Sequence, residues 1–415
     1  MSSTKPVVVI GAGIVGVSTA LWLRRAGKAV ILLDRDAPGQ ATSYGNAGVL
    51  ASAAIVPVTT PGLVWKGPGY LLDRNFPLFL RWSYLPRLMP WLLRFLSHAN
   101  DRDTRRISAA LTGLIGDSVE QHLALAKDTR AAPWVVESDY SFAYASRAEF
   151  EKDAYGWGLK QEAGFVPTLY EGAAVQAYEP SLGPDVGLVA ALPGHGFVTD
   201  PGGYVTALAE EFRAMGGEIR QAEVVDVTLT DGMVSAVVTR GGEIACDQAV
   251  LTTGAWSKPL MKKLGLTIPL ETERGYHIVF ENAQGGPTRP IMVSSGKFVA
   301  TPMKQGLRCA GIVELGGLEA GPSRAPFDLL RRQVAKSFPG LKATGEVEWM
   351  GHRPTVPDSL PLIGEIRGTG VFAGFGHQHI GLTGGPKTGR LLAQLITGQR
   401  PNQDLSAFDP VRFRG

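Results

Sequence analysis

The hydrophobic pattern is most regular at the start of the chain. Residues Val7 to Ile10 form a continuous β-branched run, which predicts a strand buried on both faces. Apolar positions at helical spacing follow in VSTALWLRRAG, and Gly27 is placed to end that helix. A second apolar run, AVILLD, ends in Asp34. The order strand, helix, strand predicts a parallel βαβ unit at the N-terminus.

The middle of the chain first has helical patterns and then strand patterns. Helices are predicted at 105–126, within 145–164, and after Pro201, where Gly216 and Gly217 end the pattern. Alternating apolar residues in 223–257 predict strands, joined by hairpin turns at Asp231-Gly232 and Gly241-Gly242. Further strands are predicted in RGYHIVF, KFVATPM and LRCAGIVEL.

Length and composition change this picture little. A chain of 415 residues, 44% hydrophobic and 19% charged, predicts a well-buried globular protein of two domains. The formal charge of +3 is too small to indicate a nucleic-acid partner. Cys246 and Cys309 form no disulfide framework and no CxxC pair for a metal, so we expect a reducing compartment.

The leader MSSTKP is short and polar, which predicts no signal peptide. The chain has no apolar run near the roughly 20 residues that span a bilayer. We expect a cytoplasmic protein, with a peripheral position on the inner face of the cytoplasmic membrane as the alternative.

Segment 63–98 motivates that alternative because its composition differs from the rest of the chain. Leucines and aromatic residues are interspersed with basic residues, against the single acid Asp73, and prolines are predicted to cut the segment into short pieces. Such a segment fits a membrane-interface patch, or short helices that pack on a second domain with their arginines in water. The basic residues are Lys66, Arg74, Arg81, Arg87 and Arg94, and the prolines are Pro77, Pro86 and Pro90.

The loop after the first strand carries Gly11, Gly13 and Gly16 in GxGxxG spacing. Gly11 suits a tight turn, Gly13 the approach of a pyrophosphate, and Gly16 close packing of helix and strand. The helix N-terminus favours phosphate, and Asp34 has the spacing of a carboxylate on ribose hydroxyls. These features together predict a dinucleotide site without deciding between NAD and FAD.

A second glycine-rich loop, GFGHQHIGLTGGPKTG, spans Gly374 to Gly389. It lies between a strand pattern and a closing helix, but no acid follows at ribose spacing, so it is no second nucleotide motif. The small, polar segment SYGNAG at 43–48 is suited to lying flat against a cofactor. We therefore expect the fold to bring both loops around one long ligand.

Five motifs occur in the order seen in flavin amine oxidoreductases of the D-amino-acid oxidase superfamily: VVVIGAGIVG…LLDR, SYGNAG, VLTTGAW, HRPTVPDSLPLIG and GHQHIGLTGGPKTG. The chain most resembles the small-subunit type of D-amino-acid dehydrogenase. The resemblance implies an α/β fold, with a Rossmann-like FAD-binding domain at 1–62, 198–258 and 348–415. Residues 63–197 and 259–347 would form a discontinuous antiparallel-sheet substrate domain.

The resemblance also implies the cofactor and its contacts. FAD would extend from the first loop to the second, with its isoalloxazine ring near the second. Sarcosine oxidases carry a flavin-binding cysteine where this chain has Gly351, so we expect non-covalent FAD. The implied cofactor-binding residues are Gly11, Gly13, Ile14, Val15, Gly16, Asp34, Arg35, Ser43, Asn46, Ala47, Gly48, Val225, Thr253, Gly254, Gly376, His377, Ile380, Gly381, Leu382 and Thr383.

Four residues are implied on the substrate side. Arg353 matches the arginine that binds the substrate carboxylate in glycine-oxidase-like members, where a bidentate pair would aim Cα–H at the flavin. Tyr276 and His277 lie where the family's sheet lines the pocket, although neighbours on a strand face opposite sides. His379 falls on the substrate side of the ring, where glycine oxidases have an arginine.

The implied activity is oxidative deamination of a D-amino acid or of a cyclic imino acid such as a D-proline derivative. No acid–base residue is required of the protein, because the reacting bond is C–H. Electrons would pass to a quinone or a similar acceptor. The alternatives are a glycine or sarcosine type of amine oxidase that uses oxygen, and a flavoprotein subunit of a hetero-oligomeric dehydrogenase.

Overall fold

The computed structural model describes residues 5–73 and 75–413. Among these residues the strands form three sheets. The first is six-stranded, in the order β18-β19-β12-β1-β2-β8, and is parallel except that β18 runs antiparallel to β19. Its strands are β1 (Val7–Ile10), β2 (Val30–Asp34), β8 (Glu218–Gln221), β12 (Gln248–Leu251), β18 (Leu362–Glu365) and β19 (Val371–Phe375).

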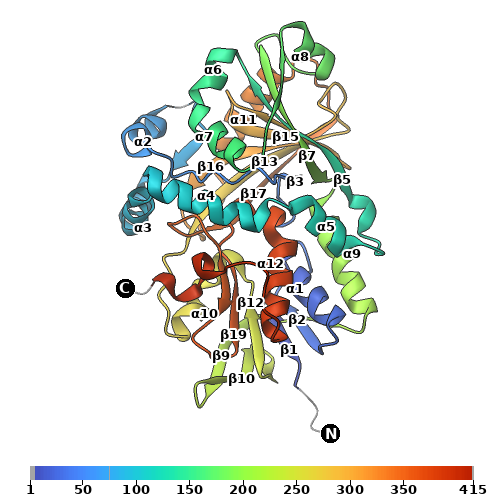
Figure 1. Ribbon diagram of the computed structural model, residues 1–415, viewed down its shortest axis with the longest axis vertical. Coiled ribbons are helices and arrows are strands. Elements are labelled where there is room, and N and C mark those ends of the chain that lie inside the picture. The colour runs from blue at the N-terminus through green and yellow to red at the C-terminus, as the bar shows by residue number, and fades with distance from the viewer. Residues whose placement is uncertain (1–4, 74, 414–415) are drawn as a thin grey trace.

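The second sheet is larger and mostly antiparallel, and it lies above the first in Figure 1. Its main path is β17-β13-β16-β15-β14-β5-β7-β3, with β4 paired to β16 and β6 to β7. The strands are β3 (Val49–Leu50), β4 (Leu78–Leu80), β5 (Val135–Tyr144), β6 (Thr168–Glu171), β7 (Leu188–Val198), β13 (Glu271–Glu281), β14 (Ile291–Val293), β15 (Phe298–Met303), β16 (Gly306–Leu315) and β17 (Gly345–Thr355).

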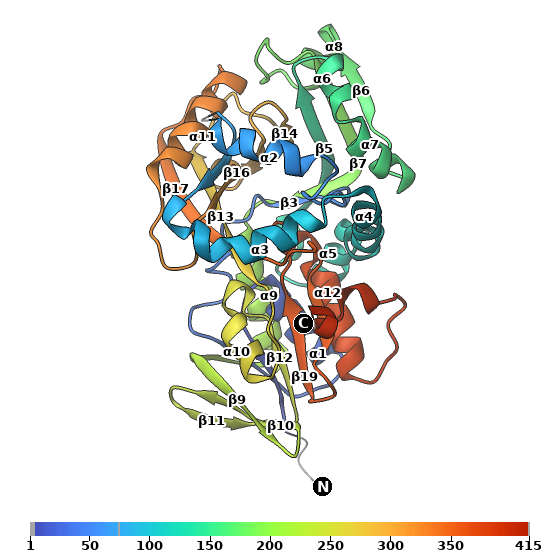
Figure 2. The same ribbon diagram turned by 90° about the vertical axis from the view of Figure 1, so that its left-hand side faces the viewer.

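The third sheet consists of the hairpins β9 (Val224–Thr230), β10 (Met233–Thr239) and β11 (Gly242–Ala245), as their turn sequences predicted. Asp231 and Gly232 both have positive φ, 53° and 81°, which an Asp-Gly turn adopts readily. This small sheet lies at the end of the molecule far from the large sheet (Figure 2).

Helices α1 (Ile14–Arg25) and α12 (Gly381–Ile396) pack side by side against the six-stranded sheet. Helix α9 (Pro201–Ala214) packs on α1, and α4 (Asp101–Ile115) and α5 (Ser118–Ala126) cross α12 (Figure 1). The other described α-helices outside segment 63–98 are α7 (Ala154–Glu162) and α11 (Arg324–Ser337), with the shorter α6 (Arg147–Lys152), α8 (Ala173–Tyr178) and α10 (Lys258–Lys263).

Two helix predictions need correction. The single helix expected over 105–126 is two helices, because the chain leaves helical geometry at Gly116-Asp117 between α4 and α5. The break lets Asp117 pair with Lys387 of α12, at 2.8 Å. The region 145–164 is likewise divided at Asp153 between α6 and α7.

Segment 63–98 consists of α2 (Leu63–Leu72), β4 and α3 (Leu85–Ser97), with Arg74 outside the described residues. It is no continuous helix, but the expectation that every proline breaks it was wrong. Pro86 and Pro90 both lie within α3. Pro86 is in the first turn, where a backbone N–H would have no helical partner in any case. Leu88, Trp91 and Phe95 of α3 are buried against Leu315 of the large sheet.

The chain passes between the two large sheets several times. β3 and most of β17 come from segments assigned above to the FAD-binding domain, and both strands pair within the large sheet. The division of the chain into two domains at the stated boundaries stays a prediction.

Candidate active site

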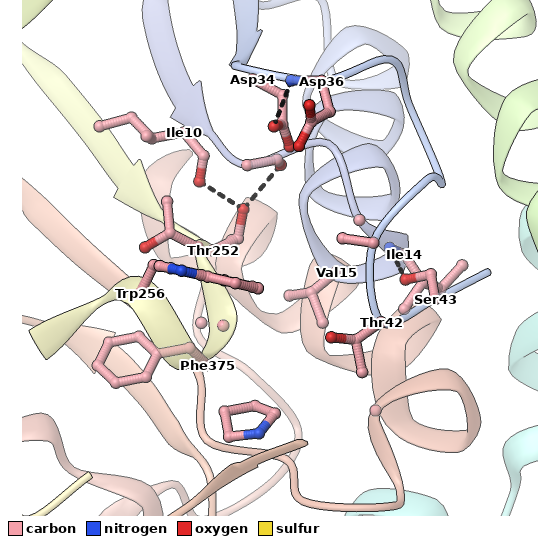
Figure 3. A pocket seen from close by; sticks show the side chains of 18 of the residues that line it. Ile10, Ile14, Val15, Asp34, Asp36, Thr42, Ser43, Thr252, Trp256 and Phe375 are labelled. Carbon is pink, nitrogen blue, oxygen red and sulfur yellow. Dashed lines mark hydrogen bonds between the residues drawn. The ribbon is translucent and has the colours of Figure 1, made fainter. Parts of the chain in front are cut away.

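A cavity of about 420 Å³ is lined by both glycine-rich loops. Gly11 and Gly13 line it from the first loop, and Gly374, His377 and Gly381 from the second. The fold therefore brings the two loops together, as expected for a single long ligand. Figure 3 shows Asp34 on one side of this cavity and Phe375 on the opposite side.

The glycines of the first loop are required by close backbone contacts. Gly11 has φ +107°, and a Cβ there would be 2.6 Å from the carbonyl oxygen of Thr252. A Cβ on Gly16 would be 1.8 Å from the carbonyl oxygen of Gly11, so α1 starts against the loop itself. Thr252 Oγ1 donates a hydrogen bond to the carbonyls of Ile10 and Gly11, at 2.8 and 2.9 Å (Figure 3). The loop is thus held tightly between β1 and β12.

The carboxylate of Asp34 is fixed at the end of β2. It accepts hydrogen bonds from the backbone N–H of Ala12, at 2.6 Å, and of Asp36, at 3.1 Å. Arg35 lines the cavity beside it and stacks on Trp256, 4.5 Å from the ring centroid. Asp34 is placed at the end of the cavity where its sequence spacing predicts ribose hydroxyls.

The SYGNAG loop is anchored on two sides. Ser43 Oγ accepts a hydrogen bond from the N–H of Ile14, the first residue of α1, at 3.0 Å (Figure 3). From the large sheet, Arg308 Nη1 donates to the carbonyls of Tyr44 and Asn46, at 2.8 and 2.7 Å. Arg308 is almost completely buried, and this burial lowers the pKa of its guanidinium to about 10. Sequence reasoning missed Arg308, because LRCAGIVEL shows only a strand.

The second loop is fixed at the first turn of α12. Pro386 has no N–H, so the carbonyl of Leu382 lacks its usual helical donor. His122 of α5 supplies the missing bond through Nε2, at 2.9 Å, and its Nδ1 lies 3.0 Å from the Tyr204 hydroxyl. Burial lowers the pKa of His122 to about 4, so the ring is neutral, with Nε2 as the donor.

His377 serves the loop in a similar way. Its Nε2 lies 2.9 Å from the Thr388 hydroxyl, and burial lowers its pKa to about 3. Gln378 N–H donates to the Pro354 carbonyl at 2.9 Å, which joins the loop to the end of β17.

Most residues expected to contact FAD line the cavity. They are Gly11, Gly13, Ile14, Val15, Asp34, Arg35, Ser43, Asn46, Val225, Thr253, Gly254, His377, Gly381 and Leu382. Gly16, Ala47, Gly48, Gly376, Ile380 and Thr383 are not among its lining residues. The sequence did not indicate Asp36, Thr42, Glu223, Thr252, Trp256 and Gln378, which do line it. Thr252 adjoins a predicted residue in VLTTGAW, so that motif was a usable signal.

On the substrate side, Arg353 lies on β17 opposite Glu273 of β13. Its side chain extends over Gly275, where a Cβ would be 2.6 Å from Arg353 Nε. Within 5–73 and 75–413, no carboxylate forms an ion pair with Arg353. Burial lowers the pKa of the guanidinium, and Glu273 opposes this effect. Arg353 is therefore a charged group with the room and the need for an anionic partner.

The two neighbours Tyr276 and His277 face opposite sides of β13. Tyr276 donates to Glu314 at 2.6 Å and accepts from the N–H of Ser323 at 3.0 Å, on the side packed against α11. Glu314 and Ser323 thus occupy its hydroxyl, and the substrate contact expected of Tyr276 from the sequence stays a prediction.

His277 does share the face of β13 that Arg353 covers. Its Nδ1 lies 3.0 Å from the carbonyl of Gly45, and its ring stacks on Trp349 at 5.1 Å. Burial, with Arg308 and Arg353, lowers the pKa of His277 to about 3. Its observed bond is thus to the SYGNAG loop.

His379 comes close to Arg353 from the second loop. The side chain of His379 is exposed, and its pKa is lowered to about 4 by partial loss of hydration and by the positive charge of Arg353. Of the four predicted substrate-side residues, the fold brings Arg353, His277 and His379 together.

The site fits FAD on the observed geometry. The glycines pack the first loop closely against its neighbours and leave its backbone without side chains, Asp34 lines the cavity, and the cavity continues to the second loop. Cys246 and Cys309 are buried and neither lines the cavity, and non-covalent attachment of FAD stays a prediction.

Comparison with known proteins gives the same assignment. Residues 6–395 match the family model DAO, described as FAD dependent oxidoreductase. The chain is 40% identical to a D-amino-acid oxidase of Bradyrhizobium diazoefficiens over 100% of both chains. It is 27% identical to a D-amino acid dehydrogenase of the same organism, over 98% of each.

An L-proline dehydrogenase from P. horikoshii superposes with a TM-score of 0.74 at 19% identity, covering 100% of this chain and 98% of that one. This likeness shows a shared fold. With the match over nearly the whole chain and the geometry of the two loops, the protein belongs to the DAO family of FAD-dependent oxidoreductases.

Proposed function

We propose that the protein catalyses the oxidative deamination of a D-amino acid or of a cyclic D-imino acid, such as a D-proline derivative. The observation that carries this proposal concerns the guanidinium of Arg353, near the second loop. Among the described residues, no carboxylate forms an ion pair with it. A carboxylate is the anion that a planar guanidinium binds best, through two parallel hydrogen bonds. The names of the two relatives also support an amino acid as the substrate.

In this proposal, Arg353 binds the substrate carboxylate and fixes the direction of Cα–H. FAD, when bound, supplies the hydride acceptor. Gly275 gives the guanidinium its room, and neutral His379 lies beside the bound carboxylate without competing for it. The first turn of α12, held by His122, directs unpaired N–H groups and the positive end of the helix dipole into the cavity. This charge favours a negative group at the second loop.

For the electron acceptor we propose a quinone or a similar carrier at a membrane surface. Buried packing accounts for one face of α3, but Trp65, Trp82 and Leu93 of segment 63–98 are 88%, 61% and 60% exposed. The exposed bases Lys66, Arg87 and Arg94 lie in the same segment. Aromatic and basic side chains together suit the interface of an anionic bilayer, on the cytoplasmic face. Within the described ranges no helix has the length and apolarity to cross a membrane.

Oxygen is the second candidate acceptor, and the name of the 40% identical relative, an oxidase, favours it. The two candidates differ in how fast the reduced protein returns to its oxidised form. This difference is measurable without knowledge of the physiological acceptor.

The test is anaerobic mixing of the purified holoprotein with D- and L-amino acids, glycine, sarcosine and hydroxyprolines, followed by the visible flavin band. We expect bleaching by D-amino acids or D-imino acids. Fast return with a soluble quinone and slow return in air supports the quinone proposal, and the reverse supports oxygen. If glycine or sarcosine alone bleaches the band, the proposed substrate class is wrong.

Two variants sharpen the assignment. Arg353→Ala should raise KM for the reactive amino acid by about 100-fold or more, because a buried charged pair is worth several kcal/mol. Arg353→Lys keeps the charge but loses the bidentate geometry and should show an intermediate effect. For the membrane proposal, the parent protein should bind vesicles with anionic lipid, and Lys66→Glu with Arg94→Glu should release it.

A further inference from the structure

Glu273 is a buried carboxylate on the same face of β13 as Gly275, over which the side chain of Arg353 extends. Its exposed fraction is 9%, and in the strand register it lies directly opposite Arg353. No described cation forms an ion pair with it. Buried carboxylates are rarely left in this way, because loss of hydration is costly without a partner. A buried carboxylate without an ion-pair partner does not stabilise the fold, which indicates a role of Glu273 in binding a ligand.

Arg353 is a cation that likewise has no ion-pair partner among the described residues. Its guanidinium extends over Gly275, along the sheet, so that the two opposite charges face one side of the sheet without forming an ion pair. Side chains directly opposite on antiparallel strands start about 5 Å apart. A ligand with a cationic and an anionic group on the same carbon atom would satisfy both residues at once. An amino-acid zwitterion has this arrangement.

The other charged or titratable groups around this face do not supply a partner for Glu273. On β13, Glu271 is bonded to the Tyr84 hydroxyl at 3.0 Å, and His277 is bonded to the SYGNAG loop. His379 on the second loop is neutral, like His277, because the pKa values of both are lowered to about 4 and about 3. On β17, the hydroxyl of Thr355 lies close enough to lower the pKa of Glu273, but it is uncharged and does not balance the carboxylate.

We propose that Glu273 binds the ammonium group of the substrate and accepts one of its protons before hydride transfer. This inference rests on the proposed function. In the step, one N–H bond of the ammonium breaks and one O–H bond forms on the Glu273 carboxylate, and no electrons are exchanged. The product is a neutral amine whose lone pair assists the departure of hydride from Cα.

The surroundings of Glu273 suit this role. Burial raises the pKa of the carboxyl, and Arg353 and the Thr355 hydroxyl only partly oppose that rise. A raised pKa makes a carboxylate a better proton acceptor for an ammonium group. The merely structural alternative is that Glu273 acts through Arg353, by balancing its charge at longer range.

Binding to the dithionite-reduced holoprotein distinguishes these roles, because the reduced protein does not oxidise the ligand. The probes are D-alanine and propionate, which has the same carbon skeleton without the amine, and calorimetry gives both Kd values. We expect Glu273→Gln to weaken D-alanine binding by 10-fold or more and to leave propionate binding unchanged or tighter. Equal weakening of both probes would overturn the proposal, since it would show an effect through Arg353.

The matched control is Glu271→Gln, on the same strand and the same face, which should change neither Kd. Glu273→Asp keeps the charge and should lie between wild type and Glu273→Gln, and retention of FAD by each variant reports correct folding. In the oxidised protein, the rate of flavin reduction by D-alanine is measured as a function of pH. The apparent pKa of this profile should be higher in Glu273→Gln than in wild type. An unshifted pH profile contradicts proton transfer to Glu273. If none of the D-amino acids and D-imino acids bleaches the flavin of wild type, the proposed function itself fails.

Discussion

Gly275 lies beneath the side chain of Arg353, so close that a Cβ on residue 275 would be 2.6 Å from Arg353 Nε. Its cross-strand partner is Gly351, where a Cβ would be 1.9 Å from Cη2 of Trp349. The two glycines form a floor without side chains on adjacent strands. Arg353 covers one glycine and Trp349 the other, so the glycine pair sets the position of both large side chains.

Gly275→Ala should displace Arg353 while leaving the β13 backbone intact, because alanine fits strand geometry. We expect KM for the reactive amino acid to rise by roughly 10-fold or more, since binding through a guanidinium is sensitive to its position. Steady-state kinetics with D-amino acids measures this. Gly158→Ala is the control, because a Cβ there meets no atom within 4 Å. Unchanged KM in Gly275→Ala would contradict the role of the glycine floor.

Trp349 should control which substrate side chains are accepted. Its ring lies over Gly351, stacks on His277 and approaches Tyr44 at 6.2 Å, next to Arg353. Trp349→Ala removes this wall and should shift kcat/KM toward amino acids with larger side chains. The ratio of kcat/KM for D-phenylalanine to that for D-alanine measures the shift. A constant ratio would place Trp349 outside the substrate pocket.

Arg308→Met should weaken FAD binding without touching the cavity wall directly. The substitution leaves the partly buried carbonyls of Tyr44 and Asn46 without this donor, at about 1 kcal/mol or more for each. We expect the Kd of FAD to rise at least 10-fold, as measured by quenching of flavin fluorescence on titration of the apoprotein. Arg324→Met, at an exposed ion pair, should have no such effect. Equal Kd values for the two variants would refute the anchoring role.

His122 should make the protein less stable as pH falls. Its folded-state pKa is about 4, below the ordinary value of 6.5, so between these values the unfolded chain binds more protons than the folded one. The free energy of unfolding therefore decreases with falling pH over this range, at up to about 1.4 kcal/mol per pH unit for one such group.

His122→Gln keeps a donor for the Leu382 carbonyl but cannot titrate. We expect its Tm at pH 8 to remain close to that of wild type and the loss of Tm between pH 6.5 and pH 5 to be smaller. Thermal unfolding monitored across this pH range tests the prediction. An identical pH slope in both proteins would mean that His122 titrates alike in the folded and unfolded states.

The sequence by itself determined the first half of the cofactor site. The strand Val7–Ile10, the three glycines and Asp34 are local in the chain, and each has a backbone or hydrogen-bonding reason that spacing alone reveals. The hairpins at Asp231-Gly232 and Gly241-Gly242 were predictable for the same reason, since turn chemistry is local. Ordered motifs were also enough to indicate the family.

Tertiary structure alone decided the substrate side. Strand periodicity could not tell which of Tyr276 and His277 shares a face of the sheet with Arg353, because it fixes only that the two side chains face opposite ways. The position of Glu273 opposite Arg353, and of Gly275 opposite Gly351, depends on the register between β13 and β17, which are separated by more than sixty residues. Arg308 and His122 act through buried carbonyls on distant segments, and a hydrogen bond to a backbone carbonyl leaves no mark in the sequence of its acceptor.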